Sequence, residues 1–490
     1  MRDPVRRTPT WPAFVVAAVA LCCRLVPVLR GGGLVGKDVY DPSVYYAAAV
    51  GLATGRLPYR DFLLLHPPGV LLVLQPFVAI GTAFGDPFGM ASARVGFMLM
   101  GAASTVLVYR LLLRQSLAAA LGGASVYAVW FPAIYSERSV FLESLGTLLL
   151  LLGVTAVLGA RPGTRGSVWT VLGGVALGFS ACVKIWGVVP LVALAAWLWW
   201  RRGRSAALRF TLGSAAAVVA VCLPFAVLGP QMWRMVVLDQ LARTPPGAGP
   251  LERLRVILGL GPVPASVGVL PLVLAAGVTL VAVRVALGSV DGQLYVVLTA
   301  ACSATLLVES TWFSHYAAFA AAPLCLLFGT AAGWLAGVLA APRTRRVVLG
   351  AGLASLAVVA GLWTATRIGS DMQGERIGEI LAGRQGCVTT DNPATLILSG
   401  TLRRNLSSGC PLVVDLGGYV LDFARRDGTT SVRPENAAFQ EFAMSYLRSG
   451  TSTMVVRFGL GGFTPANLRT IDSWAVVGQA GRTVVRQPAP

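Results

Sequence analysis

Long apolar runs recur through the first three quarters of the chain. Of its 490 residues, 55% are apolar and only 12% are charged, whereas soluble domains carry about 25% charged residues. A helix of ~20 apolar residues crosses the ~30 Å hydrocarbon core of a bilayer. We therefore expect residues 1–366 to form an all-α polytopic membrane domain. Its eleven predicted spans lie near residues 11–29, 89–112, 117–135, 139–160, 167–183, 185–200, 206–228, 265–287, 292–313, 315–340 and 346–366.

A twelfth apolar run, residues 66–84, would reverse every later loop if it crossed the membrane. If it does not cross and the N-terminus is cytoplasmic, fifteen arginines and only two acidic residues, Asp3 and Asp291, fall on the inside, as the positive-inside rule requires. We therefore predict an interfacial or re-entrant helix at 66–84, within a first external loop at 30–88. The arginines are Arg2, Arg6, Arg7, Arg110, Arg114, Arg161, Arg165, Arg201, Arg202, Arg204, Arg209, Arg284, Arg343, Arg345 and Arg346.

This topology also explains the net charge of +19, so we expect no nucleic-acid partner. It places the polar C-terminal segment, residues 367–490, outside the plasma membrane. Cys387 and Cys410 then lie where a disulfide persists; the alternative is two unpaired cysteines.

Strand and helix patterns alternate in the C-terminal segment and predict a small external α/β domain. Within it, FGLGGFTP (458–465) follows a predicted strand and opens a helix, but it lacks the last glycine of GxGxxG. Thr464 as a cap with Pro465 behind it explains the helix start, so we predict no nucleotide site. The predicted strands are 387–392, 411–415, 451–458 and 474–479, and the predicted helices are 435–448 and 465–473.

The stretch 36–69 follows the first apolar run and is too polar for lipid. It contains Asp38, Asp41, one of the two lysines and one of the two histidines, His66. Two aspartates three residues apart would share one face of a helix. The alternative is a solvated loop in which Asp41 caps a helix before Pro42.

Several ionisable residues lie near the outer ends of the predicted spans. Buried charges in a membrane are costly and mark function by default. For Arg24, Arg94 and Glu143 the alternative is a structural ion pair between Glu143 and either arginine. Lys184, between two short predicted spans, is suited to bind a phosphate or to extend along a helix end to the interface. His315 and Tyr316 open another predicted span on the same face.

Transfer of a sugar from a lipid phosphate accounts for these residue types. The sequence contains no P-loop, GxSxG, HExxH or DxD pattern, so a metal-bound nucleotide-sugar donor is disfavoured. No cofactor or metal site is implied, and dependence on a divalent metal stays open. The reaction needs a carboxylate base for the acceptor hydroxyl and cations for the leaving phosphate. We assign the base to Asp41, with Asp38 as the alternative, and consider five candidate phosphate partners: Lys184, His315, His66, Arg24 and Arg94.

The first external loop contains Asp41, Tyr45, Gly55, Tyr59, Asp61 and the motif His66-Pro67-Pro68-Gly69. In these residues it resembles the first external loop of the GT-C superfamily of integral-membrane glycosyltransferases. These include protein O-mannosyltransferases, the lipid A aminoarabinose-transferase group and actinobacterial mannosyl- and arabinosyltransferases. This chain has histidine where the aminoarabinose branch has a lysine. The segments 183–187 and 315–318 also resemble actinobacterial members.

The resemblance implies a polyprenyl-phosphate-sugar donor and inverting transfer, with Asp41 as base. We expect a hexosyl- or pentosyltransferase, mannosyl among them, that contacts membrane lipids and modifies an envelope glycan, lipid or protein on the outer face of the cytoplasmic membrane. Two alternatives stay open: a transporter or flippase of a lipid-linked sugar, and a non-catalytic envelope assembly protein. The crowding of ionisable residues on one face and the lack of an internal two-fold repeat favour an enzyme over a transporter.

Overall fold

The structure is a computed structural model that describes residues 11–160, 163–241, 243, 247–339 and 341–489. Asp3 and the arginines Arg2, Arg6, Arg7 and Arg161 of the topology argument lie outside these residues.

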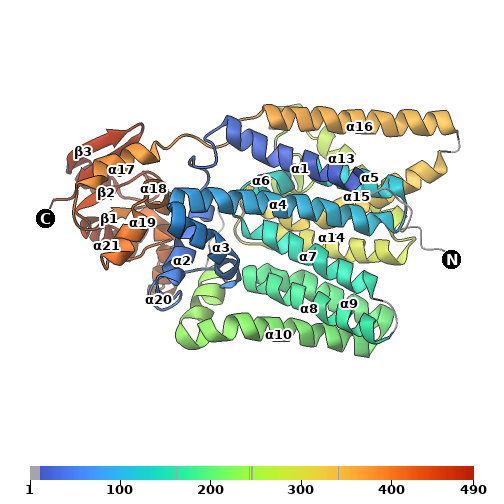
Figure 1. Cartoon of the computed structure of the whole chain (residues 1–490), viewed down its shortest axis with the longest axis horizontal. Helices are drawn as coiled ribbons and strands as arrows, with labels where there is room; N and C mark the ends of the chain where they lie inside the picture. The colour runs from blue at the N-terminus through green and yellow to red at the C-terminus, as the bar shows by residue number, and fades with distance from the viewer. Residues whose placement is uncertain (1–10, 161–162, 242, 244–246, 340, 490) are drawn as a thin grey trace. The chain divides into compact units, whose positions relative to one another are not determined.

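The protein is a multi-pass helical membrane protein with a small C-terminal sheet (Figure 1). Within the described residues, seven helices are long and apolar enough to cross a bilayer, or eight if the bent pair α5 (Leu117–Val129) and α6 (Phe131–Glu137) is one span. The seven are α1 (Trp11–Arg30), α4 (Asp86–Leu113), α7 (Leu142–Gly159), the Gly166–Val183 part of α8 (Thr164–Val183), α10 (Arg204–Leu228), α14 (Val290–Val308) and Ser314–Val338, which joins η5 (Ser314–Ala317) to α15 (Ala318–Val338).

The predicted count of eleven spans is not confirmed. Every predicted span contains a helix. Two of these helices, α9 (Val188–Arg202) and α13 (Leu270–Ala286), are shorter than a span, and within α16 (Pro342–Ala365) the fully described apolar stretch is limited to Gly350–Ala365. The run at 66–84 forms α3 (Gly69–Phe84), whose 16 residues are also too few.

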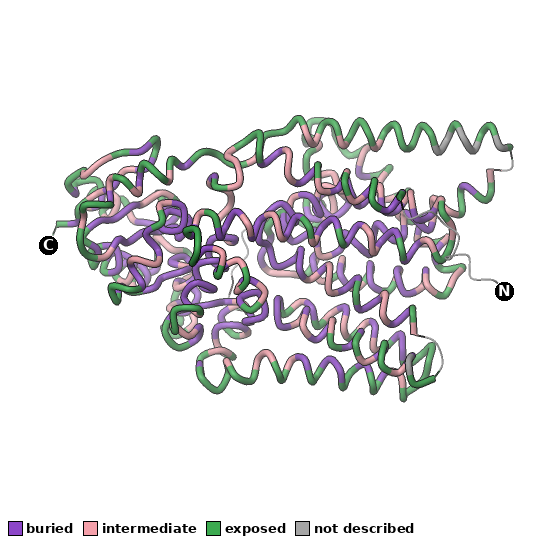
Figure 2. The backbone as a smooth tube through the Cα atoms, in the orientation of Figure 1, coloured by how far each residue is buried: buried purple, intermediate pink, exposed green. Residues whose placement is uncertain are grey.

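The described parts of Met1–Pro27, Val95–Ala220 and Pro246–Thr366 form one compact unit, here called the helical unit. Its helices pack in pairs, α5 against α15 and α7 against α8. Gly123 of α5 and Gly329 of α15 allow close approach, because a Cβ on Gly329 would lie 2.9 Å from the Cα of Gly123. Small residues play this role between membrane helices. Figure 2 shows α16 as largely exposed, as expected for a lipid-facing helix. The unit also contains α12 (Pro250–Ile257), η2 (Ile185–Gly187) and η4 (Ala265–Val267).

Val28–Arg94, Val221–Pro245 and Arg367–Pro490 form the second unit, here called the loop–sheet unit. Its sheet has the order β1-β2-β4-β3. Strand β1 (Val388–Thr390) is parallel to β2 (Ser452–Met454), while β4 (Thr483–Gln487) is antiparallel to both β2 and β3 (Ala475–Ala480). Around the sheet and the loop lie α2 (Asp41–Ala53), α17 (Gly374–Ala382), α18 (Pro393–Leu398), α19 (Leu402–Ser407), α20 (Tyr419–Asp427), α21 (Ala437–Arg448), α22 (Pro465–Ser473), η3 (Arg234–Leu238), α11 (Asp239–Leu241), η6 (Leu416–Gly418) and η7 (Arg433–Glu435).

The predicted strands at 387–392, 451–458 and 474–479 contain β1, β2 and β3, and both predicted helices form as α21 and α22. Thr464 caps α22 by accepting a hydrogen bond from the backbone N–H of Asn467. The predicted strand at 411–415 is wrong. That stretch is irregular, although Leu412, Val413 and Val414 are buried, and a short buried apolar run has the same pattern as a strand.

Backbone and side-chain hydrogen bonds join the first external loop to the C-terminal segment within the loop–sheet unit. Lys37 and Ser370 exchange backbone hydrogen bonds of 2.8 and 3.0 Å. Asp86, at the start of α4, accepts from the Arg403 Nε at 2.9 Å and from the Tyr46 hydroxyl at 3.3 Å. The loop and the segment are therefore one folded body, although more than 250 residues separate Arg94 from Arg367 in the sequence.

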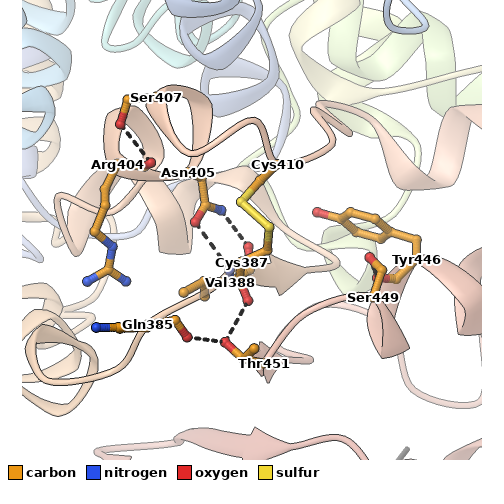
Figure 3. The surroundings of a disulfide bond; sticks show 10 residues. All are labelled: Gln385, Cys387, Val388, Arg404, Asn405, Ser407, Cys410, Tyr446, Ser449 and Thr451. Carbon is orange, nitrogen blue, oxygen red and sulfur yellow. Dashed lines mark hydrogen bonds between the residues drawn. A yellow bond between two sulfur atoms is a disulfide. The ribbon is translucent and has the colours of Figure 1, made fainter.

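Cys387 and Cys410 form a disulfide with a Cα–Cα distance of 5.6 Å (Figure 3). The bond joins Cys387, just before β1, to Cys410, which follows α19. Beside it, the Asn405 amide donates to the Val388 carbonyl at 2.6 Å and accepts from its N–H at 3.1 Å. The disulfide and this amide fix α19 against the first strand.

Replacing both cysteines, Cys387→Ser with Cys410→Ser, is expected to lower the free energy of unfolding of the loop–sheet unit by about 3 kcal/mol, because the bond closes a loop of 23 residues in sequence separation. Chemical denaturation of the purified chain measures the change. Cys22→Ser, at an exposed free cysteine, is the control, and an equal effect of the two substitutions contradicts the prediction.

Candidate functional site

The predicted site residues divide between the two units, and each set is described within its own unit. The loop–sheet unit holds Asp38, Asp41, Tyr45, Tyr59, Asp61, His66 and Arg94, and the helical unit holds Arg24, Glu143, Lys184, His315 and Tyr316.

Asp41 is the first residue of α2 and is half-buried, while the residues after it, 42–51, are buried. Tyr40 occupies the N-cap position and makes no side-chain cap, so the alternative in which Asp41 caps the helix is wrong. A carboxylate in the first turn is stabilised by the helix dipole. Asp38 lies before the helix, in the irregular segment that follows Lys37. The expectation that the two aspartates share a helix face is therefore also wrong.

Tyr40 links the start of α2 to the C-terminal segment. Its hydroxyl donates to the Asp415 Oδ1 at 3.0 Å, and the Arg457 guanidinium lies 3.2 Å from the centre of its ring. Burial, and next the Asp415 carboxylate, hold the Tyr40 pKa well above its usual value, so the hydroxyl stays a donor. Sequence reasoning missed Asp415 and Arg457, because 375 residues separate Tyr40 from Asp415 and no spacing pattern connects them.

His66 is held in place by two tyrosines of the predicted motif. Tyr59 is fully buried with a left-handed φ of 65°, which is uncommon for a bulky residue. Its hydroxyl donates to the His66 backbone carbonyl at 2.6 Å. The Tyr45 ring meets the His66 ring edge-on, with centroids 5.6 Å apart. These contacts fix the turn at which α3 begins.

Asp61 and Arg94 stabilise loop backbone. The Asp61 carboxylate accepts from the Leu57 N–H at 2.7 Å and from Arg60 at 2.9 Å, and the Arg60 hydrogen bond lowers the Asp61 pKa. Arg94 donates to the carbonyls of Leu34 at 2.5 Å and Gly36 at 2.9 Å. Arg94 therefore orders the chain that leads to Asp38.

In the helical unit, Lys184 and Glu143 form a buried ion pair of 2.6 Å. Glu143 lies in the first turn of α7, and Lys184 lies in extended conformation between α8 and η2. The Lys184 ammonium is also 3.7 Å from the ring centre of Trp186 and 3.8 Å from that of Tyr316. A cation over desolvated aromatic rings gains electrostatic energy. Its position is thus fixed by one carboxylate and two rings.

His315 lies in η5 beside this group. Its ring centre is 4.5 Å from that of Phe141 and 4.7 Å from that of Tyr316. Tyr316 contacts both His315 and Lys184, so the structure brings together four predicted residues from three separate helix ends. The sequence had placed Lys184 and His315 on one face without connecting them to Glu143.

Arg24 is fully buried and pairs with Glu137 rather than Glu143. Its Nε donates to Glu137 at 2.7 Å, and its Nη1 donates to the carbonyls of Ala20 at 2.8 Å and Ala128 at 2.9 Å. The Tyr127 hydroxyl also donates to Glu137. Glu143 instead pairs with Lys184, so the expected Arg24–Glu143 pair is wrong. In this conformation Arg24 has a structural role.

Within the described ranges, no group of three His, Cys, Asp or Glu side chains is placed to hold a metal ion. Any divalent cation would need oxygen ligands from a bound phosphate as well.

No family model matches the sequence, and no curated protein matches it. The fold, however, is found in solved structures. ArnT from Cupriavidus metallidurans in the apo state is 15% identical with a TM-score of 0.63, over 97% of this chain and 98% of that one. The same protein bound to undecaprenyl phosphate is 14% identical with a TM-score of 0.57, over 99% and 100%.

The archaeal oligosaccharyltransferase AglB from Archaeoglobus fulgidus, in complex with an inhibitory peptide and a dolichol-phosphate, is 12% identical with a TM-score of 0.56, over 91% of this chain and 69% of that one. These neighbours are GT-C glycosyltransferases, and this chain has a GT-C-like fold.

Arg24→Ala is expected to lower the free energy of unfolding by about 3–5 kcal/mol, because Glu137 would stay buried without its cation. The double variant Arg24→Met with Glu137→Gln removes both charges of this pair and is expected to lower the free energy of unfolding by less. Thermal and chemical denaturation of the detergent-solubilised protein compare the two. Arg376→Ala, which breaks an exposed pair with Glu379, is the control at about 0–1 kcal/mol. A loss for Arg24→Ala no greater than this control contradicts the prediction.

Proposed function

We propose that this protein is a glycosyltransferase that moves a sugar from a polyprenyl-phosphate donor to a hydroxyl of an envelope glycan, lipid or protein. The reaction takes place on the outer face of the cytoplasmic membrane, with the C-terminal domain extracytoplasmic and the N-terminus inside. One observation carries the proposal: the fold matches that of ArnT over nearly the whole of both chains, and one ArnT structure holds undecaprenyl phosphate.

Asp41 is the proposed base. It accepts the proton of the acceptor hydroxyl while the hydroxyl oxygen bonds to the anomeric carbon of the sugar. The bond from that carbon to the phosphate oxygen breaks, its electron pair stays on the phosphate, and the configuration at the carbon inverts. Two features support the assignment. Asp41 is half-buried at a helix start, and Tyr40 before it is fixed by Asp415 and Arg457.

Lys184 and His315 are the proposed partners of the donor phosphate, with His66 and Arg94 as further candidates. The Lys184 ammonium donates to Glu143 at 2.6 Å, and a lysine pairs with phosphate as a point charge. The aromatic walls and Glu143 keep Lys184 ordered before the donor arrives, so less conformational entropy is lost on binding. Glu143 is then a positioning residue for Lys184 and makes no contact with the reacting atoms.

Asp41→Asn is expected to lower the transfer rate by at least ~10²-fold, because the amide cannot accept the proton, with unchanged expression and an intact Cys387–Cys410 disulfide. The assay incubates purified protein with labelled polyprenyl-phosphate sugars and a membrane extract. Asp38→Asn, at the neighbouring half-buried aspartate, is the matched control.

Retained activity in Asp41→Asn together with lost activity in Asp38→Asn moves the base to Asp38. Saturable donor binding or flipping without turnover in the native protein would instead indicate a transporter or an assembly protein.

Lys184→Ala is expected to raise the KM for the donor about tenfold or more, because one charge-assisted hydrogen bond to the phosphate is lost. Lys184→Arg keeps the cation and is expected to retain more of the affinity. Steady-state kinetics at varied donor concentration separates KM from kcat. An unchanged KM in Lys184→Ala contradicts the proposal that Lys184 binds the donor phosphate.

A further inference from the structure

The loop 456–463, which carries the glycine-rich motif after β2, has a rigid base and an exposed tip. The buried Asp391 carboxylate accepts from the backbone N–H groups of Val456 at 2.8 Å, Arg457 at 2.9 Å and Phe458 at 2.6 Å. At the far end, the Gln440 amide donates to the Gly462 carbonyl at 2.8 Å. Between these anchors, residues 459–461 are exposed. These hydrogen bonds therefore fix the positions of the side chains next to the start of the loop.

Two arginines lie against the ring of Phe458, at the fixed end of this loop. The guanidinium carbon of Arg457 is 4.8 Å from the centre of Phe458, and that of Arg433 is 5.0 Å from it. Arg457 is exposed and also stacks on Tyr40 at 3.2 Å. Arg433 is partly buried, and its Nε donates to the Gly417 carbonyl at 3.3 Å. In the part of the chain that the structure describes, neither arginine forms an ion pair with a carboxylate.

Two carboxylates lie in this region, and both already have hydrogen-bond donors. Asp391 accepts from the three backbone N–H groups of the loop. Asp415 accepts from the Tyr40 hydroxyl and from the Gly418 N–H, each at 3.0 Å. Burial, and next the neighbouring Arg457 charge, lower the Arg433 pKa. Two like charges brought together and partly desolvated are unfavourable unless an anion joins them. A guanidinium binds a carboxylate or a phosphate through two parallel hydrogen bonds.

We propose that Arg433 and Arg457 bind an anionic group of the acceptor, a carboxylate or a phosphate close to the hydroxyl that receives the sugar. The proposal rests on the proposed function, because Tyr40, on which Arg457 stacks, immediately precedes the proposed base Asp41. An anion held by Arg457 is thereby placed beside the start of α2. The acceptor class is therefore a negatively charged envelope glycan or lipid headgroup rather than a neutral polyol.

Calorimetric titration of the full-length protein in detergent tests this inference with defined probes. Methyl glucuronide carries a carboxylate, methyl glucoside 6-phosphate carries a phosphate, and methyl glucoside is neutral. We expect saturable binding of at least one charged probe and binding of the neutral one at least tenfold weaker. Undecaprenyl phosphate forms a fourth arm that separates an acceptor anion from the donor phosphate.

Arg457→Gln is the principal variant, because it removes an exposed guanidinium and leaves a planar polar group against the Tyr40 ring. It is expected to weaken the charged probe at least tenfold and to leave undecaprenyl phosphate binding unchanged; Arg433→Gln is expected to act in the same direction. Arg376→Gln, in an exposed ion pair of the same unit, is the matched control and is expected to bind like the native protein.

Equal binding of neutral and charged probes, no binding of any charged probe, or unchanged binding in both variants overturns the inference. Lost undecaprenyl phosphate binding in Arg457→Gln also overturns it, because the arginines would then serve the donor. The titration needs no sugar transfer. A protein without transferase activity therefore refutes the proposed function, while the binding data still decide whether this arginine pair is an anion site.

Discussion

The attachment of the first polar loop to the C-terminal segment is the constraint on which the loop–sheet unit depends. Polar loop backbone is stable only when its hydrogen-bonding groups find partners. Here Lys37 pairs with Ser370 through the main chain, and Tyr40 finds Asp415. The residues before α2 contain three glycines at positions 31–33, the residue type with the greatest backbone freedom. Their conformation is stabilised by Arg94 and by the C-terminal segment.

The helical unit obeys a different constraint, because its charges lie among apolar side chains. Each is neutralised locally: Arg24 by Glu137 and two carbonyls, Lys184 by Glu143 and two rings. The two pairs differ in chemistry. The Arg24 side chain is fully buried in its pair with Glu137, which suits a structural role. The Lys184 side chain keeps 11% exposure, which is compatible with the phosphate contact proposed for it.

The sequence predicts well what depends on composition and local pattern. The membrane class, the helix in every apolar run, Thr464 as a cap and the pairing of Cys387 with Cys410 follow from hydropathy, capping chemistry and compartment. Span lengths were less predictable, because a proline or an extended residue ends a helix inside an apolar run, as at Trp130 before α6. The partners of Tyr40, next to Asp41, could not be predicted, since Asp415 and Arg457 reach it only through the tertiary fold.

The Tyr40–Asp415 hydrogen bond also affects the order in which parts of the protein form during synthesis. The two residues are 375 positions apart, and synthesis at ~5–20 residues per second separates them by roughly 20–75 s. During that interval the membrane helices emerge while the start of α2 has no partner to fix it. The proposed base is therefore completed last, after the C-terminal segment has been made. An incomplete chain with every membrane helix in place would still lack Asp415, and with it the hydrogen bond that fixes Tyr40 beside the proposed base.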